Sequence, residues 1–495
     1  MSPPLTVVRG QGCVILVAPH AGRRDVRRRP WGSAPLRMND LHTGALTREL
    51  AARLDASAVI NEAGDRNDVD LNRISQAHDA APHFLDALAQ IAEDALSRHP
   101  RLQLLTVHGW NVAQPAVDIG LGTQPSATAL QGGHGTAFSE TFAAEHLPRF
   151  ASELAGRGIR TTPGLRYPAR ARENLLQLFT GRYHEDDRIA VRRLARLADR
   201  VDAIQLELGL PLRLLGPWRD EFLAACTSVF ATGTTTPVRA AWPAWMAPTP
   251  DAPDRVALEF TAPGLCGLAA IDPHGGRLLL FPDDGRLYTF TGERAGVDRA
   301  HHVAGLGLQA TAGRVDLTYD GPMLAFPDTR PFVDLEHGLA GARAVRARVA
   351  LRFESSHAGT TGPCPFGRVQ GRASIDGATH DVDGNGVHAE RPVDMGAAPR
   401  AALRLLDGTL VITAGDEGLL CHQGRHQPLT RCALRHQDGT AQLTAHTADG
   451  SRIDATLSIV HRLPVVPGMP GATPTLFGAC GHDAGLAGWI RVRSA

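Results

Sequence analysis

The first 230 residues alternate between short apolar segments and longer amphipathic ones. The apolar segments have the length and the valine, isoleucine and leucine content of buried strands, and the amphipathic ones carry apolar residues at helical spacing. Strands are predicted near residues 13–18, 57–61, 102–107, 116–120 and 202–208, and helices near 40–54, 80–98, 138–156, 185–199 and 217–230. This alternation predicts an α/β fold with a mixed, mostly parallel sheet flanked by helices.

Polar residues stand where several predicted strands end. His20 follows the run Val14-Ile15-Leu16-Val17, His108 ends the run from Leu104, and Glu207 lies in an apolar strand near residue 205. The pair Asn72-Arg73 lies at a further strand end. Ligands of such sheets bind at the carboxyl ends of strands, so we expect these side chains to converge.

The residue types at these ends indicate metal-dependent hydrolysis. Two histidines and a carboxylate can hold zinc with an open position, and zinc lowers the pKa of a bound water to about 7. A glutamate beside it can accept a proton and return it to a leaving amine. An adjacent asparagine and arginine can clamp a substrate carboxylate. Each residue also has a structural alternative, namely a hydrogen-bonded histidine, a glutamate paired with an arginine, or an ion pair that stabilises a turn.

Composition excludes several other classes. The chain has 495 residues, is 43% hydrophobic and has a formal net charge of +0, which favours two or three domains and gives no electrostatic case for nucleic acid or membrane partners. All 51 basic side chains are arginine. The absence of lysine excludes a Walker-type phosphate loop and Schiff-base chemistry.

The seven cysteines form no C-x-x-C pair, and the first residues carry no signal-peptide pattern. Scattered, odd-numbered thiols are typical of a reducing compartment. We therefore expect a soluble, cytoplasmic protein.

The second half differs in composition. Residues 1–235 are predicted to form the α/β domain, residues 236–255 a proline-rich linker and residues 256–495 a β-rich domain. Turn signals recur between strand-like segments of the last part, at Asp284-Gly285, Asp320-Gly321, Asp376-Gly377, Asp407-Gly408, Asp438-Gly439 and Asp449-Gly450.

Six motifs in order across about 190 residues resemble the N-formylglutamate amidohydrolase family, and more distantly the zinc carboxypeptidase and aspartoacylase group. They are Pro19-His20-Ala21-Gly22, Asn39-Asp40-Leu41-His42, Asp70-Leu71-Asn72-Arg73, His108-Gly109-Trp110, Val117-Asp118-Ile119-Gly120-Leu121-Gly122 and Gln205-Leu206-Glu207-Leu208. The resemblance implies the phosphorylase/hydrolase-like fold of zinc peptidases.

The resemblance also implies residue roles. His20 and His108 are then zinc ligands, Glu207 is the general base, and Asn72 with Arg73 binds the substrate's α-carboxylate. The wider group has a glutamate ligand three residues after the first histidine, where this chain has Arg23.

Two aspartates, Asp25 and Asp40, are the alternatives for the third metal ligand. Arg170, Arg172 and Asn174 are candidates for further substrate contacts, with a solvated amphipathic helix as the alternative.

The β-rich half resembles tandem lipocalin-like barrels of the carotenoid hydratase type. Such a barrel could enclose an apolar ligand, or serve as a filled scaffold or oligomerisation domain.

The leading hypothesis is a zinc-dependent amidohydrolase that releases a formyl or acyl group from a small acidic amide. Such an enzyme could form a homo-oligomer. The alternatives are a non-catalytic binding protein with an apolar ligand in the barrel and a carboxypeptidase-like peptidase.

Overall fold

The computed structural model describes residues 5–23, 37–133, 135–231, 256–282, 285–294, 301–327, 338–339, 341–355, 366–389, 400–404, 410–414, 417–422, 425–437, 440–465, 475–482 and 485–493. The chain divides into two compact units, Met1–Met246 and Ala247–Ala495. The linker predicted at 236–255 lies outside the described residues. The predicted domain bounds therefore stay predictions.

The described part of the first unit contains a seven-stranded sheet in the order β1-β3-β2-β4-β7-β5-β6. The central strands β3, β2, β4 and β7 are parallel, whereas β1 and β5 run antiparallel to β3 and β7. The bounds are β1 Thr6–Val8, β2 Val14–Ala18, β3 Ser57–Ile60, β4 Leu102–Trp110, β5 Ala116–Gly120, β6 Arg160–Thr162 and β7 Val201–Gly209. The predicted mixed, mostly parallel sheet is confirmed.

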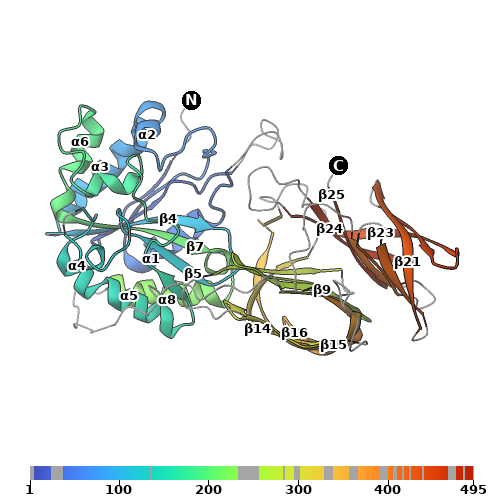
Figure 1. Ribbon diagram of the computed structural model, residues 1–495. Coiled ribbons are helices and arrows are strands. Elements are labelled where there is room, and N and C mark those ends of the chain that lie inside the picture. The colour runs from blue at the N-terminus through green and yellow to red at the C-terminus, as the bar shows by residue number, and fades with distance from the viewer. Residues whose placement is uncertain are drawn as a thin grey trace. The chain divides into compact units, whose positions relative to one another are not determined.

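Helices cover both faces of this sheet (Figure 1). The α-helices are α1 Thr43–Leu54, α2 Ile74–Ala80, α3 Pro82–Leu96, α4 Glu140–Glu145, α5 Leu147–Gly156, α6 Ile189–Ala195, α7 Leu210–Arg213 and α8 Pro217–Phe230. Short 3-10 helices are η1 Ala129–Gln131, η2 Leu175–Phe179 and η3 Ala198–Arg200.

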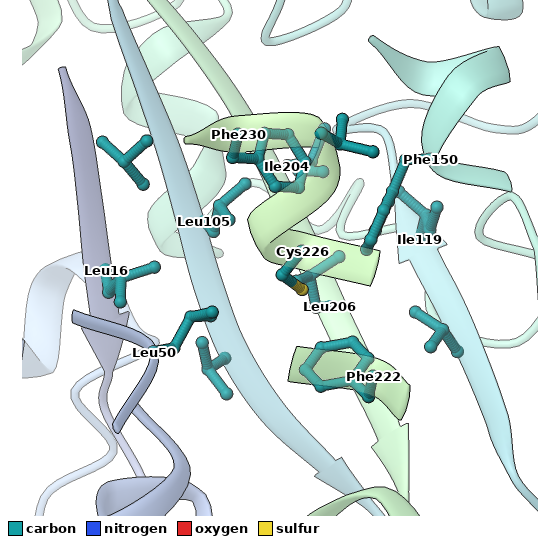
Figure 2. Close-up of a cluster of buried hydrophobic side chains, with 14 of the residues drawn as sticks. Leu16, Leu50, Leu105, Ile119, Phe150, Ile204, Leu206, Phe222, Cys226 and Phe230 are labelled. Atoms are coloured by element: carbon teal, nitrogen blue, oxygen red, sulfur yellow. The ribbon is translucent and has the colours of Figure 1, made fainter. Parts of the chain in front are cut away.

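Because successive side chains of a strand point to opposite faces, the sheet has one hydrophobic cluster on each face. Leu16 and Leu206 pack with α1, α4, α5 and α8, in the cluster of which Figure 2 shows a part. Ile15 and Val17 face the other side and pack with α2, α3, α6 and η2.

The same alternation decides where the polar residues of the central strands lie. Leu105 and Val107 of β4 belong to the first cluster, so His108 of that strand faces the other side. Leu206 and Leu208 of β7 likewise place Glu207 on that side. Both polar residues therefore stand on one face, near the carboxyl ends of two adjacent parallel strands.

Several predicted helices differ in extent from the observed ones. The helix predicted over 138–156 is two helices, because Pro148 lacks an N–H and stands in the first turn of α5. Pro82 begins α3 in the same way and separates it from α2. The helix predicted over 185–199 is α6 alone, followed by η3.

The second unit is antiparallel β, as predicted. Its described strands form a ten-stranded sheet in which β11 also pairs with β14, so that β8-β9-β10-β11-β14-β15-β16-β17 closes into an eight-stranded ring. The bounds are β8 Val256–Ala262, β9 Leu265–Ile271, β10 Gly275–Pro282, β11 Leu287–Glu293, β12 His302–Val303, β13 Leu306–Thr311, β14 Arg314–Phe326, β15 Arg343–Ser355, β16 Phe366–Ile375 and β17 Ala378–Ala389.

A second closed barrel follows along the chain, in the order β18 to β25. Its strands are β18 Arg400–Arg404, β19 Leu410–Ala414, β20 Glu417–His422, β21 Arg425–Gln437, β22 Thr440–Thr447, β23 Arg452–Val465, β24 Thr475–His482 and β25 Gly485–Arg493.

The predicted turn at Asp320-Gly321 is wrong, because both residues lie inside β14. The Asp320 carboxylate accepts hydrogen bonds from Arg346 and Arg348 of the neighbouring strand. Gly321 leaves room for a tyrosine hydroxyl, 2.9 Å from where a Cβ would stand. Here the dipeptide serves packing rather than chain reversal.

The turn at Asp376-Gly377 is confirmed. Ile375 pairs with Ala378, and the two residues between have φ of 53° and 84°. This is the conformation that a two-residue hairpin requires. Asp449-Gly450 joins β22 to β23 as predicted, whereas Asp284, Asp407-Gly408 and Asp438-Gly439 lie outside the described residues.

Large side chains pack the interior of the first barrel. Phe260, Phe290, Leu317 and Phe353 are each 0% exposed, so no space of the size of a water molecule adjoins them. Room for an apolar ligand is therefore lacking beside these residues. Within the described ranges, no helix reaches the length and apolar content that a bilayer crossing demands.

Candidate metal centre

Three buried side chains meet at the carboxyl edge of the sheet. His20 follows β2, His108 lies in β4, and Asp40 precedes α1, where its backbone N–H donates to the carbonyl of His20 at 2.8 Å. One ligand atom of each side chain lies within 4.8 Å of the other two. They are 1%, 2% and 3% exposed, in the order His20, His108, Asp40, and so form an enclosed group.

The two oxygens of Asp40 have different partners. Oδ2 lies 3.2 Å from Nδ1 of His20 and 3.2 Å from Nδ1 of His108. Oδ1 accepts a hydrogen bond from Arg66 Nη1 at 3.1 Å. One oxygen is thus held by an arginine, and the other shares a small volume with two imidazole nitrogens.

Asp70 occupies the far side of the His20 ring. Its Oδ1 lies 2.6 Å from Nε2 of His20, and the same oxygen accepts the backbone N–H of Asn72 at 3.1 Å. Arg37 donates to the second oxygen at 3.2 Å. A carboxylate behind a histidine fixes the tautomer and the orientation of a metal-binding ring.

This arrangement fits a divalent cation. Both nitrogens of His20 face carboxylate oxygens, and a neutral imidazole has a hydrogen for only one of them. A divalent cation held by His20, His108 and Asp40 would resolve that conflict, and His20 Nε2 would then donate its hydrogen to Asp70. Two imidazoles and one carboxylate are a ligand set of catalytic zinc.

The same contacts set the protonation of the group. Burial lowers the pKa of His20, but hydrogen bonds to Asp40 and Asp70 outweigh it, so that the pKa is raised. Burial also lowers the pKa of His108, and here it prevails over the hydrogen bond to Asp40. Burial raises the pKa of Asp40, yet hydrogen bonds with His108 and His20 hold it well below its usual range. An ionised Asp40 and a neutral His108 are the forms that bind metal, whereas the raised pKa of His20 favours its protonated form, so metal binding must displace a proton from His20.

Glu207 lies one strand away from His108. The two residues are direct neighbours in the parallel pairing of β4 with β7 and share one face of the sheet. Burial, reinforced by the negative charge of Asp40, raises the pKa of Glu207 well above its usual range. A raised pKa makes a carboxylate a stronger base.

Asn72 and Arg73 follow Asp70 and Leu71 in the segment before α2. The Arg73 side chain is 39% exposed, and its Nε lies 3.8 Å from Asp70 Oδ2, which leaves the guanidinium accessible to a ligand. The backbone of Arg73 forms an antiparallel bridge with Asn174.

The remaining predicted residues do not belong to the three-residue group. Arg170 and Arg172 are exposed, and so is Arg23. Asn174 is buried, and its polar atoms bond Leu176 N–H and Gln205. Asp25 lies outside the described residues, so that of the two aspartates it is Asp40 that the structure places beside both histidines.

Four residues of the site were missed in the sequence. Asp70 and Arg66 belong to the segment around the Asn-Arg pair, and Gln205 stands two residues before Glu207 in an apolar strand, a position that puts both on one face. Arg213 is 0% exposed and donates hydrogen bonds to the carbonyls of Leu41 and Trp110. Burial lowers the pKa of Arg213 to about 10, so it stays charged at neutral pH.

No protein-family model matches the chain, and no curated protein matches it. Among solved structures, N-formylglutamate amidohydrolase from Ralstonia eutropha JMP134 is similar to its N-terminal half, with 16% identity and a TM-score of 0.33 over 46% of this chain and 96% of that one. The gene product Atu2144 from Agrobacterium tumefaciens is similar over 45% of this chain and 88% of its own, with 15% identity and a TM-score of 0.29. A structure of CghA with Sch210972 has 9% identity and a TM-score of 0.27 over 49% of this chain and 88% of its own. At such scores the likeness carries no argument by itself.

Proposed function

We propose that the N-terminal unit is a zinc-dependent amidohydrolase that cleaves a formyl or acyl amide beside a carboxylate. The observation that carries this proposal is the convergence of His20 Nδ1 and His108 Nδ1 on one oxygen of Asp40, with Glu207 on the adjacent strand and the same face. The accessible guanidinium of Arg73 supports a substrate that carries a carboxylate.

His20, Asp40 and His108 would hold the zinc ion, and Asp70 would keep the His20 ring in place. When bound, zinc polarises a carbonyl oxygen and makes water more acidic. Glu207 accepts a proton from the water that attacks the amide carbonyl and returns that proton to the leaving amine. Arg73, with Asn72 beside it, binds the substrate carboxylate and so determines which amide reaches Glu207.

Metal analysis combined with two substitutions tests this function. Protein purified without chelators and supplied with zinc is expected to bind one zinc per chain and to hydrolyse N-formylglutamate or a related N-acyl acidic amino acid. We expect His108→Ala to lose most of the metal while the fold persists. We expect Glu207→Gln to keep the metal and lower kcat by about 10²–10⁴-fold.

The control is His146→Ala. His146 is a histidine of the same unit that bonds Gln103 and stacks on Phe142, and its removal should leave metal binding intact. A wild-type protein that takes up no divalent metal contradicts the proposal. Loss of zinc in Glu207→Gln would make Glu207 a ligand instead of the base.

A further inference from the structure

A chain of buried side-chain amides ends on Glu207. Asn174 Nδ2 donates to Gln205 Oε1 at 3.0 Å, and Gln205 Nε2 donates to Glu207 Oε1 at 2.9 Å. The exposed fractions of the three residues are 9%, 3% and 7%. Water therefore competes little for these hydrogen bonds.

The direction of the chain is set by the backbone at its far end. Asn174 precedes η2, and its Oδ1 accepts the N–H of Leu176 at 2.8 Å. Since a backbone N–H can only donate, the amide of Asn174 must turn its oxygen toward Leu176 and its nitrogen toward Gln205. Gln205 must then present its oxygen to Asn174 and its nitrogen to Glu207. The acceptor at the end is Oε1 of the Glu207 carboxylate.

We propose that Asn174 and Gln205 are positioning residues that hold Glu207 by Oε1 and thereby reserve Oε2 as the oxygen that accepts and returns the proton. This inference rests on the proposed role of Glu207 as the base. A donor fixed on Oε1 favours the ionised carboxylate and opposes a proton at that oxygen. It also restricts the rotamers of a side chain that must meet its substrate in one geometry.

The same loop joins the base to the carboxylate clamp. Asn174 forms a β-bridge with Arg73, and Leu175 N–H donates to the carbonyl of Asn72 at 3.1 Å. Asn174 therefore contacts the clamp through its backbone and is linked to the base through the side chain of Gln205. These two connections set the distance between the two halves of the site.

The test compares Gln205→Met and Asn174→Asp with wild type in zinc-loaded full-length protein. Gln205→Met keeps the volume but cannot donate to Glu207, so we expect kcat to fall about 10–100-fold with KM and zinc content nearly unchanged. Asn174→Asp keeps an acceptor for Leu176 N–H, as a helix cap requires. It cannot donate to Gln205, whose amide should then turn its oxygen toward Glu207, so we expect a similar fall in kcat.

Gln177→Met is the matched control. Gln177 is 0% exposed and donates to the carbonyls of Gly122 and Ala169, both at 2.7 Å. Its substitution should lower thermal stability and leave kcat within about twofold. Crystals of metal-free Gln205→Met should show Glu207 in more than one rotamer, a readout that does not depend on turnover.

The outcomes separate the two proposals. An active, zinc-binding wild type whose kcat survives both Gln205→Met and Asn174→Asp overturns the positioning role alone. A wild type that binds no zinc and cleaves none of the amides overturns the proposed function and this inference with it. If Gln205→Met does not fold, the Asn174→Asp result decides.

Discussion

At the scale of single residues, the site depends on how each polar atom is used. Asp40 gives one oxygen to Arg66 and the other to two imidazoles, and Asp70 gives one oxygen to His20 and the other to Arg37. Both carboxylates therefore have an arginine on the side away from the histidines. Burial raises the pKa of Asp70, but the hydrogen bond with His20, the positive charges of His20 and Arg66 and the backbone N–H of Asn72 together outweigh it and lower the pKa to about 2.

Arg73 carries the residue-scale prediction. Arg73→Ala removes a charge-assisted hydrogen bond to the substrate carboxylate. We expect kcat/KM to fall roughly 30-fold, mainly through a higher KM, which corresponds to a loss of about 2 kcal/mol of transition-state stabilisation. Steady-state kinetics on an N-acyl acidic amino acid measure this. The same variant should treat an amide without the carboxylate as wild type does. Equal kcat/KM for variant and wild type on the acidic substrate would rule out the clamp.

Arg9→Ala is a control for the loss of an arginine. Arg9 is 57% exposed and pairs with Asp94 at the surface. Its removal should change neither kinetic constant by more than about twofold, because exposed ion pairs contribute little.

At the scale of elements, successive side chains of β4 and β7 point to opposite faces of the sheet, so the apolar ones pack in the core and the polar ones face the candidate site. Leu206 and Leu208 enter the cluster of Figure 2, while Gln205 and Glu207, between and beside them, face the opposite side. The pairing of β4 with β7 then sets Glu207 beside His108. A shift of one residue in this register would bring apolar side chains to the site and glutamate to the core.

The hairpin of β16 and β17 carries the prediction at this scale. Gly377 has φ of 84°, and a Cβ there would meet nothing within 4 Å. Gly377→Ala therefore tests conformation alone, and we expect it to lower the free energy of unfolding by about 1 kcal/mol. Urea unfolding of the full chain measures the change.

Gly341→Ala is the matched control in the same unit. Its Cβ would meet one backbone oxygen at 3.9 Å, an ordinary contact, and its φ lies outside the left-handed region. This substitution should be neutral or slightly stabilising, because it restricts the unfolded chain. Equal losses in both variants would show that the left-handed turn is not the cause.

At the scale of the whole molecule, the two units have separate cores. The sheet of the first unit is complete within Met1–Met246, and its hydrophobic clusters use residues of that unit alone. The three residues of the candidate metal centre lie there as well. The residues of the proposed metal site and of the two hydrophobic clusters therefore all belong to the first unit.

We predict that a chain cut to residues 1–246 folds and binds zinc with the stoichiometry of the full protein. Circular dichroism should show the helical signal, and metal analysis the bound ion. The complementary piece, residues 247–495, should show a strand spectrum and bind no stoichiometric zinc. A soluble but unfolded first piece would mean that the second unit supplies part of its stability.

Much of this organisation follows from local pattern. The strands that carry the site were predicted close to their observed bounds, since buried parallel strands are continuous apolar runs that stop at the sheet edge. The change to antiparallel β in the second half was predicted from turn signals. Local pattern failed at Asp320-Gly321, because the same two residues suit either a turn or the close packing of neighbouring strands.

The sequence by itself determined the fold class and the types of residue that can do chemistry, because both depend on hydrophobic spacing and on positions near strand ends. Only the tertiary structure decided which of them meet. Asp40, Asp70 and His108 lie 20, 50 and 88 residues from His20, and no local spacing brings them to one ring. The amide chain from Asn174 to Glu207 needs a loop to pack on a strand 31 residues away. Such contacts form only when burial on both faces of the sheet brings distant segments together, so their geometry is a property of the packed molecule.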